Sequence, residues 1–316
     1  MLFFLSPLIG ELLSGSAPPS EFFTLFGFTI MSLLYGGGAV IARELKITWG
    51  KGVGSLLLIG ASYGIVEEGL MVASFQNPNW IDLGFLGSFG RWVGVNWVWA
   101  VELMIYHSIV SITVPTLLVE LFYPLEKNKS WLKGRWRKIL PALFIANVVI
   151  GFFLFSEFTG FTPAIPQYVL FVVLSLMLLY FAYIIPNDLL RRGNRPLRKP
   201  RYYFLISFLG SIVCGFVFGV LPERLSFTGA PVIVIILGVG IIVTIFRFLA
   251  SYNWSQSSPL HYHRLIFGSL FIFIIFSFFQ EFDTSRLDDT TGMSIVGSIF
   301  LIAFLILGYK LAHEVD

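Results

Sequence analysis

Apolar runs of about 20 residues recur along the whole chain, and this pattern constrains the fold more than any other feature. A helix needs about 20 residues to cross the hydrocarbon core of a bilayer, because each residue advances it by about 1.5 Å. Only 12% of the 316 residues are charged, whereas a soluble globular chain carries about 25%. The composition therefore excludes a soluble enzyme, a disordered chain and a nucleic-acid-binding protein.

Hydropathy predicts an all-α, polytopic integral membrane protein with about 10 transmembrane helices. The first segment is short and ends at two prolines, Pro18 and Pro19, so it is either a span or a re-entrant segment. The predicted spans cover residues 2–16, 22–42, 53–75, 92–122, 139–158, 166–185, 203–221, 231–250, 265–280 and 293–311.

Basic residues fall almost entirely on one side of this arrangement, which the positive-inside rule assigns to the cytoplasm. Of the 21 Lys and Arg residues, only Arg91, Arg224 and Arg286 lie on the other side. The N-terminus and the C-terminus are therefore predicted to be cytoplasmic, and if the first segment does not cross, only the N-terminus changes side. The two densest basic groups are Lys127, Lys129, Lys133, Arg135, Arg137 and Lys138, and Arg191, Arg192, Arg195, Arg198, Lys199 and Arg201.

The same basic loops define the expected surroundings of the chain. They are typical topology signals that face anionic lipid, so we expect membrane lipids as partners and no nucleic acid. We place the chain in the plasma or inner membrane of a prokaryote. The single cysteine, Cys214, lies in an apolar segment, so the sequence predicts no disulfide framework.

Ionisable side chains inside the predicted spans mark candidate functional sites, because a charge is costly to bury in a bilayer. Away from the predicted helix ends, all of them occur in the first half of the chain. We therefore divide the single membrane domain into residues 1–158, which carry the polar cluster, and an apolar half, residues 159–316. The ionisable residues away from predicted helix ends are Glu11, Glu67, Glu68, Glu102 and His107.

Four of these residues are expected to share one layer in the outer half of the bilayer, because their two helices run in opposite directions. They are Glu67, Glu68, Glu102 and His107. On an α-helix Glu67 shares a face with Tyr63, whereas Glu68 lies on the adjacent face, so we expect one of the two glutamates to point elsewhere. For Glu11, near an uncertain helix end, the sequence favours a structural role.

A carboxylate beside a histidine has three chemical uses. It activates water as a general base, it carries protons, or it binds a cation together with the imidazole. The alternative is a buried cluster that is satisfied internally, with Tyr63 or Arg91 bonded to a glutamate. Catalytic roles are assigned to Glu67, Glu68 and His107, and contacts to a substrate are assigned to Glu102, Asn96, Tyr63, Arg91 and Asn147.

The cofactor stays open at this stage. A metal is compatible with the carboxylates and imidazole of the cluster. A haem is not expected, because His107 is the only imidazole within the predicted spans. His261 and His263 are predicted to lie in a solvated cytoplasmic loop.

The segment Tyr63-Gly64-Ile65-Val66-Glu67-Glu68-Gly69-Leu70, followed by a helix with His107, resembles the CAAX protease and bacteriocin-processing (CPBP) superfamily. Those intramembrane proteases and their relatives are marked by Glu-Glu-x-x-x-Arg, Phe-x-x-x-His and a later His-x-x-x-Asn/Asp helix. The resemblance implies that Glu67 or Glu68 activates a water molecule, and that His107 holds the water or stabilises the oxyanion. The chain departs from the motifs at Val72 and Leu103, and Asn147 is the only embedded polar stand-in for the last motif.

Three function classes remain open. The first is a glutamate-dependent intramembrane hydrolase that acts on a peptide or a lipid-linked bond. The second is a proton- or cation-coupled transporter, because ten helices divide into five plus five inverted repeats. The third is a non-catalytic protein that binds lipid or partner helices. The substrate is undefined in all three.

Overall fold

The computed structural model describes residues 1–187, 189–190, 193–284 and 286–313. Within these residues, nine helices are long and apolar enough to cross a membrane, so the predicted all-α, polytopic fold is confirmed. The first predicted span is instead a short apolar helix, Leu2–Leu13. At about 1.5 Å per residue it reaches about 18 Å, less than the hydrocarbon thickness of about 30 Å. Arg191 and Arg192 lie outside the described residues.

The first half of the chain supplies α1 (Leu2–Pro7), η1 (Leu8–Leu13), α2 (Pro19–Phe22), α3 (Leu25–Met31), η2 (Ser32–Gly36), α4 (Gly37–Thr48), α5 (Val53–Gly64), η3 (Ile65–Met71), η4 (Ile81–Gly87), α6 (Trp97–Tyr106), η5 (His107–Thr113), α7 (Val114–Phe122), η6 (Pro124–Glu126) and α8 (Trp136–Thr159). Two strands of two residues each, β1 (Arg91–Trp92) and β2 (Val95–Asn96), pair antiparallel as a hairpin in the loop before α6. The second half supplies α9 (Ile165–Ile184), α10 (Pro200–Gly215), η7 (Phe216–Val220), α11 (Leu221–Arg224), α12 (Ala230–Ala250), η8 (Trp254–Gln256), α13 (Pro259–Gln280) and α14 (Met293–His313).

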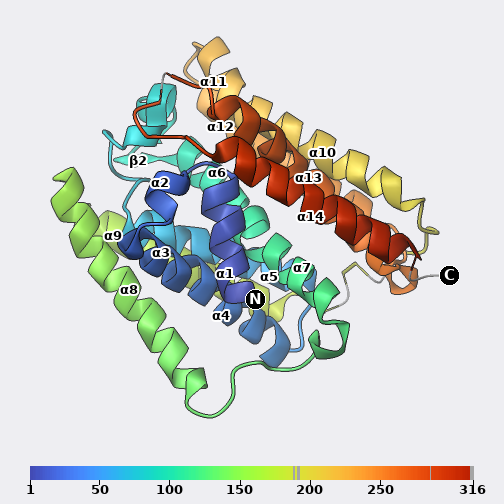
Figure 1. Cartoon of the computed structure of the whole chain (residues 1–316). Helices are drawn as coiled ribbons and strands as arrows, with labels where there is room; N and C mark the ends of the chain where they lie inside the picture. Colours follow the sequence, from blue (N-terminus) through green and yellow to red (C-terminus); the bar gives the residue numbers. More distant parts are fainter. Residues whose placement is uncertain (188, 191–192, 285, 314–316) are drawn as a thin grey trace.

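The described helices form three layers (Figure 1). The middle layer holds the short N-terminal helix and the three spans that follow it. Helices α8 and α9 cover one side, where they contact α4, α5 and η3, and α10 and α12 to α14 cover the other, where they contact α6, α7 and η1. Because α9 packs on α5 and η3, the helices around the polar residues extend to Ile184, beyond the predicted division at residue 158.

An ionic network ties the middle layer together at its end near the loop after α7. The buried Arg43 of α4 lies 3.2 Å from Glu44 and 3.5 Å from Glu120 of α7, and Lys46 lies 2.6 Å from the same Glu120. The Arg43 guanidinium also stacks 3.3 Å from the ring of Trp131. A buried charge needs such partners, so this network fixes α4 against α7.

Two glycines bring α5 into close contact with the helix of His107. A Cβ atom at Gly60 would lie 2.7 Å from the Cα of Ser108, and one at Gly64 would lie 3.1 Å from the Cβ of His107. Small residues four apart allow this backbone approach between membrane helices. The crossing brings the end of α5 beside the start of η5, where the candidate site lies.

Gly60→Ala is expected to destabilise the protein by roughly 1–3 kcal/mol, because the new methyl group meets backbone atoms that cannot rotate away. Gly240→Ala on α12 is the matched control, since a Cβ there has no atom within 4 Å. The control is expected to be neutral or stabilising by up to about 1 kcal/mol. Thermal unfolding in detergent, followed by circular dichroism, measures both, and equal effects would contradict the packing argument.

Candidate functional site

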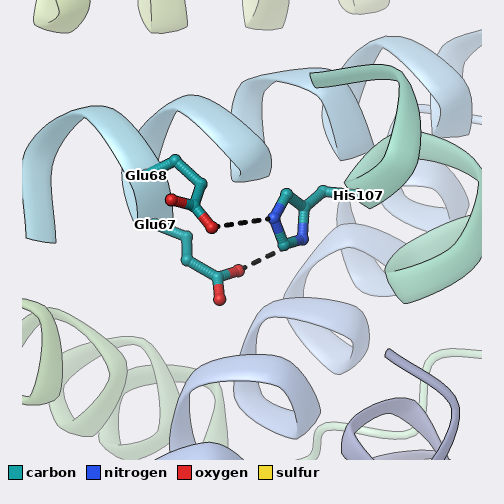
Figure 2. Close-up of side chains that lie close together, drawn as sticks. All are labelled: Glu67, Glu68 and His107. Atoms are coloured by element: carbon teal, nitrogen blue, oxygen red, sulfur yellow. Dashed lines mark hydrogen bonds and ion pairs between the residues drawn. The ribbon is translucent and has the colours of Figure 1, made fainter. Parts of the chain in front are cut away.

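Glu67 and Glu68 both point toward the imidazole of His107 (Figure 2). The Oε1 atom of Glu68 lies 3.3 Å from Nε2, and the Oε2 atom of Glu67 lies 3.3 Å from Nδ1. Glu67 and His107 are 4% and 2% exposed, and Glu68 is partly buried. The expectation that one of the two glutamates points elsewhere is therefore wrong.

The physical reason is local helix geometry. Both glutamates lie in η3, a π-helical turn, and His107 begins another, η5. A π turn has more residues per turn than an α-helix, so neighbours in sequence are rotated less from each other. The α-helical period used for the prediction separates Glu67 from Glu68, whereas the π turn lets both carboxylates reach one imidazole.

Glu68 is the more firmly held of the two glutamates. Its Oε2 atom accepts a hydrogen bond from the hydroxyl group of Ser74. The indole of Trp99 donates to the same Ser74 oxygen at 3.1 Å, and the other carboxylate oxygen faces His107. Charge-assisted bonds of this kind fix the orientation of a carboxylate. Glu68 is thus suited to orienting the imidazole.

The carboxylate of Glu67 can accept further hydrogen bonds. Its Oε2 atom lies 3.3 Å from His107 Nδ1, and the hydroxyl group of Tyr63 contacts the same carboxylate. Both buried atoms nevertheless lack a hydrogen bond of normal geometry among the described residues. The ring of Tyr63 lies 5.8 Å from that of His107, while Ser111 Oγ lies 3.0 Å from His107 Nδ1. Burying a polar atom without a well-formed hydrogen bond costs about 1–3 kcal/mol of stability. The Oε2 atom of Glu67 and the hydroxyl group of Tyr63 are therefore candidates to bind a substrate group, a water molecule or a cation.

Glu11 and Tyr35 join the cluster from the N-terminal helices. The Tyr35 hydroxyl group donates to Glu11, and the Tyr35 ring lies 5.9 Å from that of His107. Sequence analysis favoured a structural role for Glu11 and did not select Tyr35. The sequence signal that could have indicated these contacts is the presence of glycines at positions where helices approach closely. A Cβ at Gly10 would lie 2.8 Å from the Tyr35 ring, and one at Gly38 would overlap the ring of Tyr63.

The carboxylates and the imidazole of the cluster all lie in π-helical turns, whereas Tyr63 lies in α5. Among the described residues such turns occur at η1, η2, η3, η5 and η7, and the first four carry the residues around His107. These turns widen the helix and frequently occur at functional sites. Their cluster members are Glu11 in η1, Tyr35 in η2, Glu67 and Glu68 in η3, and His107 in η5.

Three other candidates for substrate contact are engaged in the scaffold. Asn96 caps α6, where its side chain accepts a hydrogen bond from the backbone N–H of Trp99 at 3.0 Å. Arg91 donates to the carbonyl group of Gln76 at 2.8 Å and to three further loop carbonyls. Asn147 donates to the carbonyl of Ile30 at 3.3 Å. Of the five candidates for substrate contact, only Tyr63 is brought to the cluster.

Glu102 lies elsewhere, in contrast to the expected common layer. It lines a separate cavity of about 220 Å³ with Asp82 and Glu223. Its Oε2 atom is buried without a hydrogen-bond partner among the described residues. Helix rise gives the depth of Glu102 but not the direction in which it points, so the prediction placed it too near His107.

The loop assignment of two histidines is also wrong, because α13 begins at Pro259, before the predicted start at residue 265. His263 is fully buried, and its Nε2 atom lies 3.0 Å from the carbonyl oxygen of Phe304. His261 lies in the first turn of α13, with Nδ1 2.8 Å from the hydroxyl group of Ser258. Neither histidine is a free loop residue.

A metal ion could be held by the central cluster. One ligand atom each from Glu67, Glu68 and His107 lies within 4.8 Å of the others. Two carboxylates and one imidazole suit several divalent transition metals, and a cation would offset the charge of the adjacent glutamates. The same set also works without a metal, with one carboxylate accepting a proton from water.

The fold and the cluster define a multi-pass membrane protein with a buried, intramembrane polar site. The chain belongs to an uncharacterized membrane protein family, whose sequence model matches residues 1–313. No curated protein matches the chain. No solved structure matches it either. The site must therefore be interpreted from its own geometry.

Glu67→Gln is expected to leave the protein at least as stable as the wild type. The amide keeps the shape of the side chain and removes repulsion among three buried carboxyl groups. His107→Ala is expected to destabilise the protein by roughly 1–3 kcal/mol, because Glu68 loses a partner.

Thermal unfolding in detergent distinguishes these effects. Glu157→Gln, an exposed residue near the end of α8, is the control and is expected to have no effect. A loss of stability in Glu67→Gln equal to that in His107→Ala would show that Glu67 serves the fold rather than a site.

Proposed function

We propose that the protein is an intramembrane hydrolase in which a glutamate activates water. The observation that carries the proposal is the convergence of two carboxylates on one buried imidazole. The resemblance of this Glu-Glu and His arrangement to the CPBP superfamily supports it. The substrate is a peptide or a lipid-linked bond that enters from the membrane, and the setting is the plasma or inner membrane of a prokaryote.

Glu67 is the general base in this proposal. Its carboxylate, which lacks a hydrogen bond of normal geometry at Oε2, accepts a proton from water, and the resulting hydroxide attacks the scissile carbonyl carbon. When the scissile bond breaks, Glu67 returns this proton to the leaving group. Glu68, fixed by Ser74, orients His107. Both ring nitrogens face carboxylates. Once Glu67 has taken the proton from water, Nδ1 of His107 is suited to donating to the oxyanion, with the Tyr63 hydroxyl group as a second donor.

Proton- or cation-coupled transport is the second candidate. One observation favours it: the short helix Leu2–Leu13, which carries Glu11 to the cluster, is similar to the interrupted helices of many transporters. Against it, the nine long spans in the described residues do not divide into two equal repeats. The non-catalytic alternative requires a cluster satisfied internally. The contact of Tyr63 with Glu67 favours it, whereas the lack of a hydrogen bond of normal geometry at either group in the described residues argues against it.

Glu67→Gln is expected to lower hydrolysis by at least roughly 100-fold, because the amide cannot accept the proton from water. Membranes of a bacterial host that expresses the wild type, Glu67→Gln or Glu157→Gln can be compared by labelling new peptide N-termini and by mass spectrometry of lipid products. Products are expected with the wild type and with Glu157→Gln only.

Two outcomes change the assignment. Identical products from the wild type and Glu67→Gln would overturn the hydrolase proposal, and flux of protons or cations in proteoliposomes that requires Glu67 would then favour transport. Activity that is lost with a chelator and restored by a divalent cation would make Glu67, Glu68 and His107 metal ligands.

Tyr63→Phe and Tyr35→Phe form a matched pair that separates catalysis from stability. Tyr63→Phe is expected to slow hydrolysis by roughly 100-fold without lowering Tm, because its hydroxyl group forms no hydrogen bond of normal geometry in the described chain. Tyr35→Phe is expected to cost roughly 1–3 kcal/mol, since it removes the bond to Glu11. A fall in Tm with Tyr63→Phe would argue for a purely structural hydroxyl group.

A further inference from the structure

A second cavity lies far from the glutamates, where α10 and α13 begin. Its volume is about 410 Å³, within the range typical of ligand sites. The two helices contact each other along their length and lie side by side (Figure 1). By the positive-inside rule this end of the molecule faces the cytoplasm. The lining residues are Lys199, Pro200, Arg201, Phe204, Leu260, Arg264 and Phe267.

The rim of the cavity is cationic. Lys199 and Arg201 lie at the first turn of α10, and Arg264 lies in the second turn of α13. No carboxylate lines the cavity, and none of the three cations is paired with a carboxylate among the described residues. Both helices also direct their N-termini toward this end, which adds positive potential. Three cations that line one cavity without a carboxylate among them are complementary to a phosphate group.

The floor of the cavity is apolar. Phe204 and Phe267, whose ring centroids are 5.3 Å apart, close it on the side of the membrane core. The aromatic wall continues deeper between the helices, because Phe208 and Phe271 pack on Phe204 at 5.9 and 5.4 Å. A free phosphate ion would make no favourable contact with this aromatic wall. An acyl chain would pack favourably against it, because contact with the rings replaces contact with other lipids.

We propose that this cavity is a binding site for one anionic phospholipid. Lys199, Arg201 and Arg264 bind the phosphate of the headgroup, and Leu260, Phe204 and the rings below it contact an acyl chain. Basic pockets between membrane helices at the cytoplasmic side are suited to anionic headgroups. The lipid bridges α10 and α13, and it is independent of the chemistry at His107.

Native mass spectrometry of the purified full chain in detergent tests the proposal, with phosphatidylglycerol and phosphatidylcholine as probes. The wild type is expected to retain phosphatidylglycerol in preference to phosphatidylcholine. The triple variant Lys199→Gln, Arg201→Gln, Arg264→Gln is expected to bind phosphatidylglycerol about 100-fold more weakly, at about a factor of 5 per cation.

The control carries the same change of charge in the other basic loop. It combines Lys133→Gln, Arg135→Gln and Lys138→Gln, three exposed residues outside the cavity. Binding is expected to change less than about threefold in this control. If the triple cavity variant does not fold, the double variant of the exposed Lys199 and Arg201 replaces it, with a loss of about tenfold or more expected.

Three results would overturn the proposal. Equal binding of phosphatidylcholine would remove the role of headgroup charge. Equal loss in the control variant would show that general surface charge attracts the lipid. Inorganic phosphate that raises Tm as much as phosphatidylglycerol does would assign the cavity to a free phosphate, and the acyl contacts would have no role.

Discussion

The cost of burying carboxyl groups inside a bilayer governs the architecture around His107. Three of them, from Glu11, Glu67 and Glu68, approach one imidazole, and in a low-dielectric interior each requires a hydrogen-bond donor or an opposite charge. The middle layer supplies these groups from several helices at once, and glycines allow the helices to approach closely enough. The outer helices need no such polar groups, so they present mainly apolar surface to lipid.

The π-helical turns show how the chain meets this demand locally. Each turn weakens the regular hydrogen-bond ladder of its helix, and in exchange it redirects a side chain that an α-helix would present elsewhere. In η3 this geometry lets the carboxylates of both Glu67 and Glu68 contact the imidazole of His107. Four of the five π-helical turns in the described residues therefore coincide with the polar cluster, and η7 lies apart from it.

Sequence analysis predicted the all-α fold because hydropathy reports the bilayer, in which the backbone must form helices. It also predicted the approach of Glu67 to His107, since helix rise fixes depth. It missed the direction of Glu68 because a π turn leaves no mark in the α-helical period. It misplaced His263 because the neighbouring charged Arg264 conceals the start of α13, and it did not select Tyr35, whose contact with Glu11 depends on how the N-terminal helices pack.

The short N-terminal helix has a consequence for the biogenesis of the protein. The chain after it is anchored to the last loop: Gln280 donates to the carbonyl of Ser14 at 2.9 Å, and Arg286 donates to that of Gly15 at 2.7 Å. These partners leave the ribosome some 270 residues later. Tyr35 and Tyr106 hold Glu11 and Gly10 from the first half of the chain, but the segment after Glu11 gains these last anchors only when the final helical hairpin has been inserted.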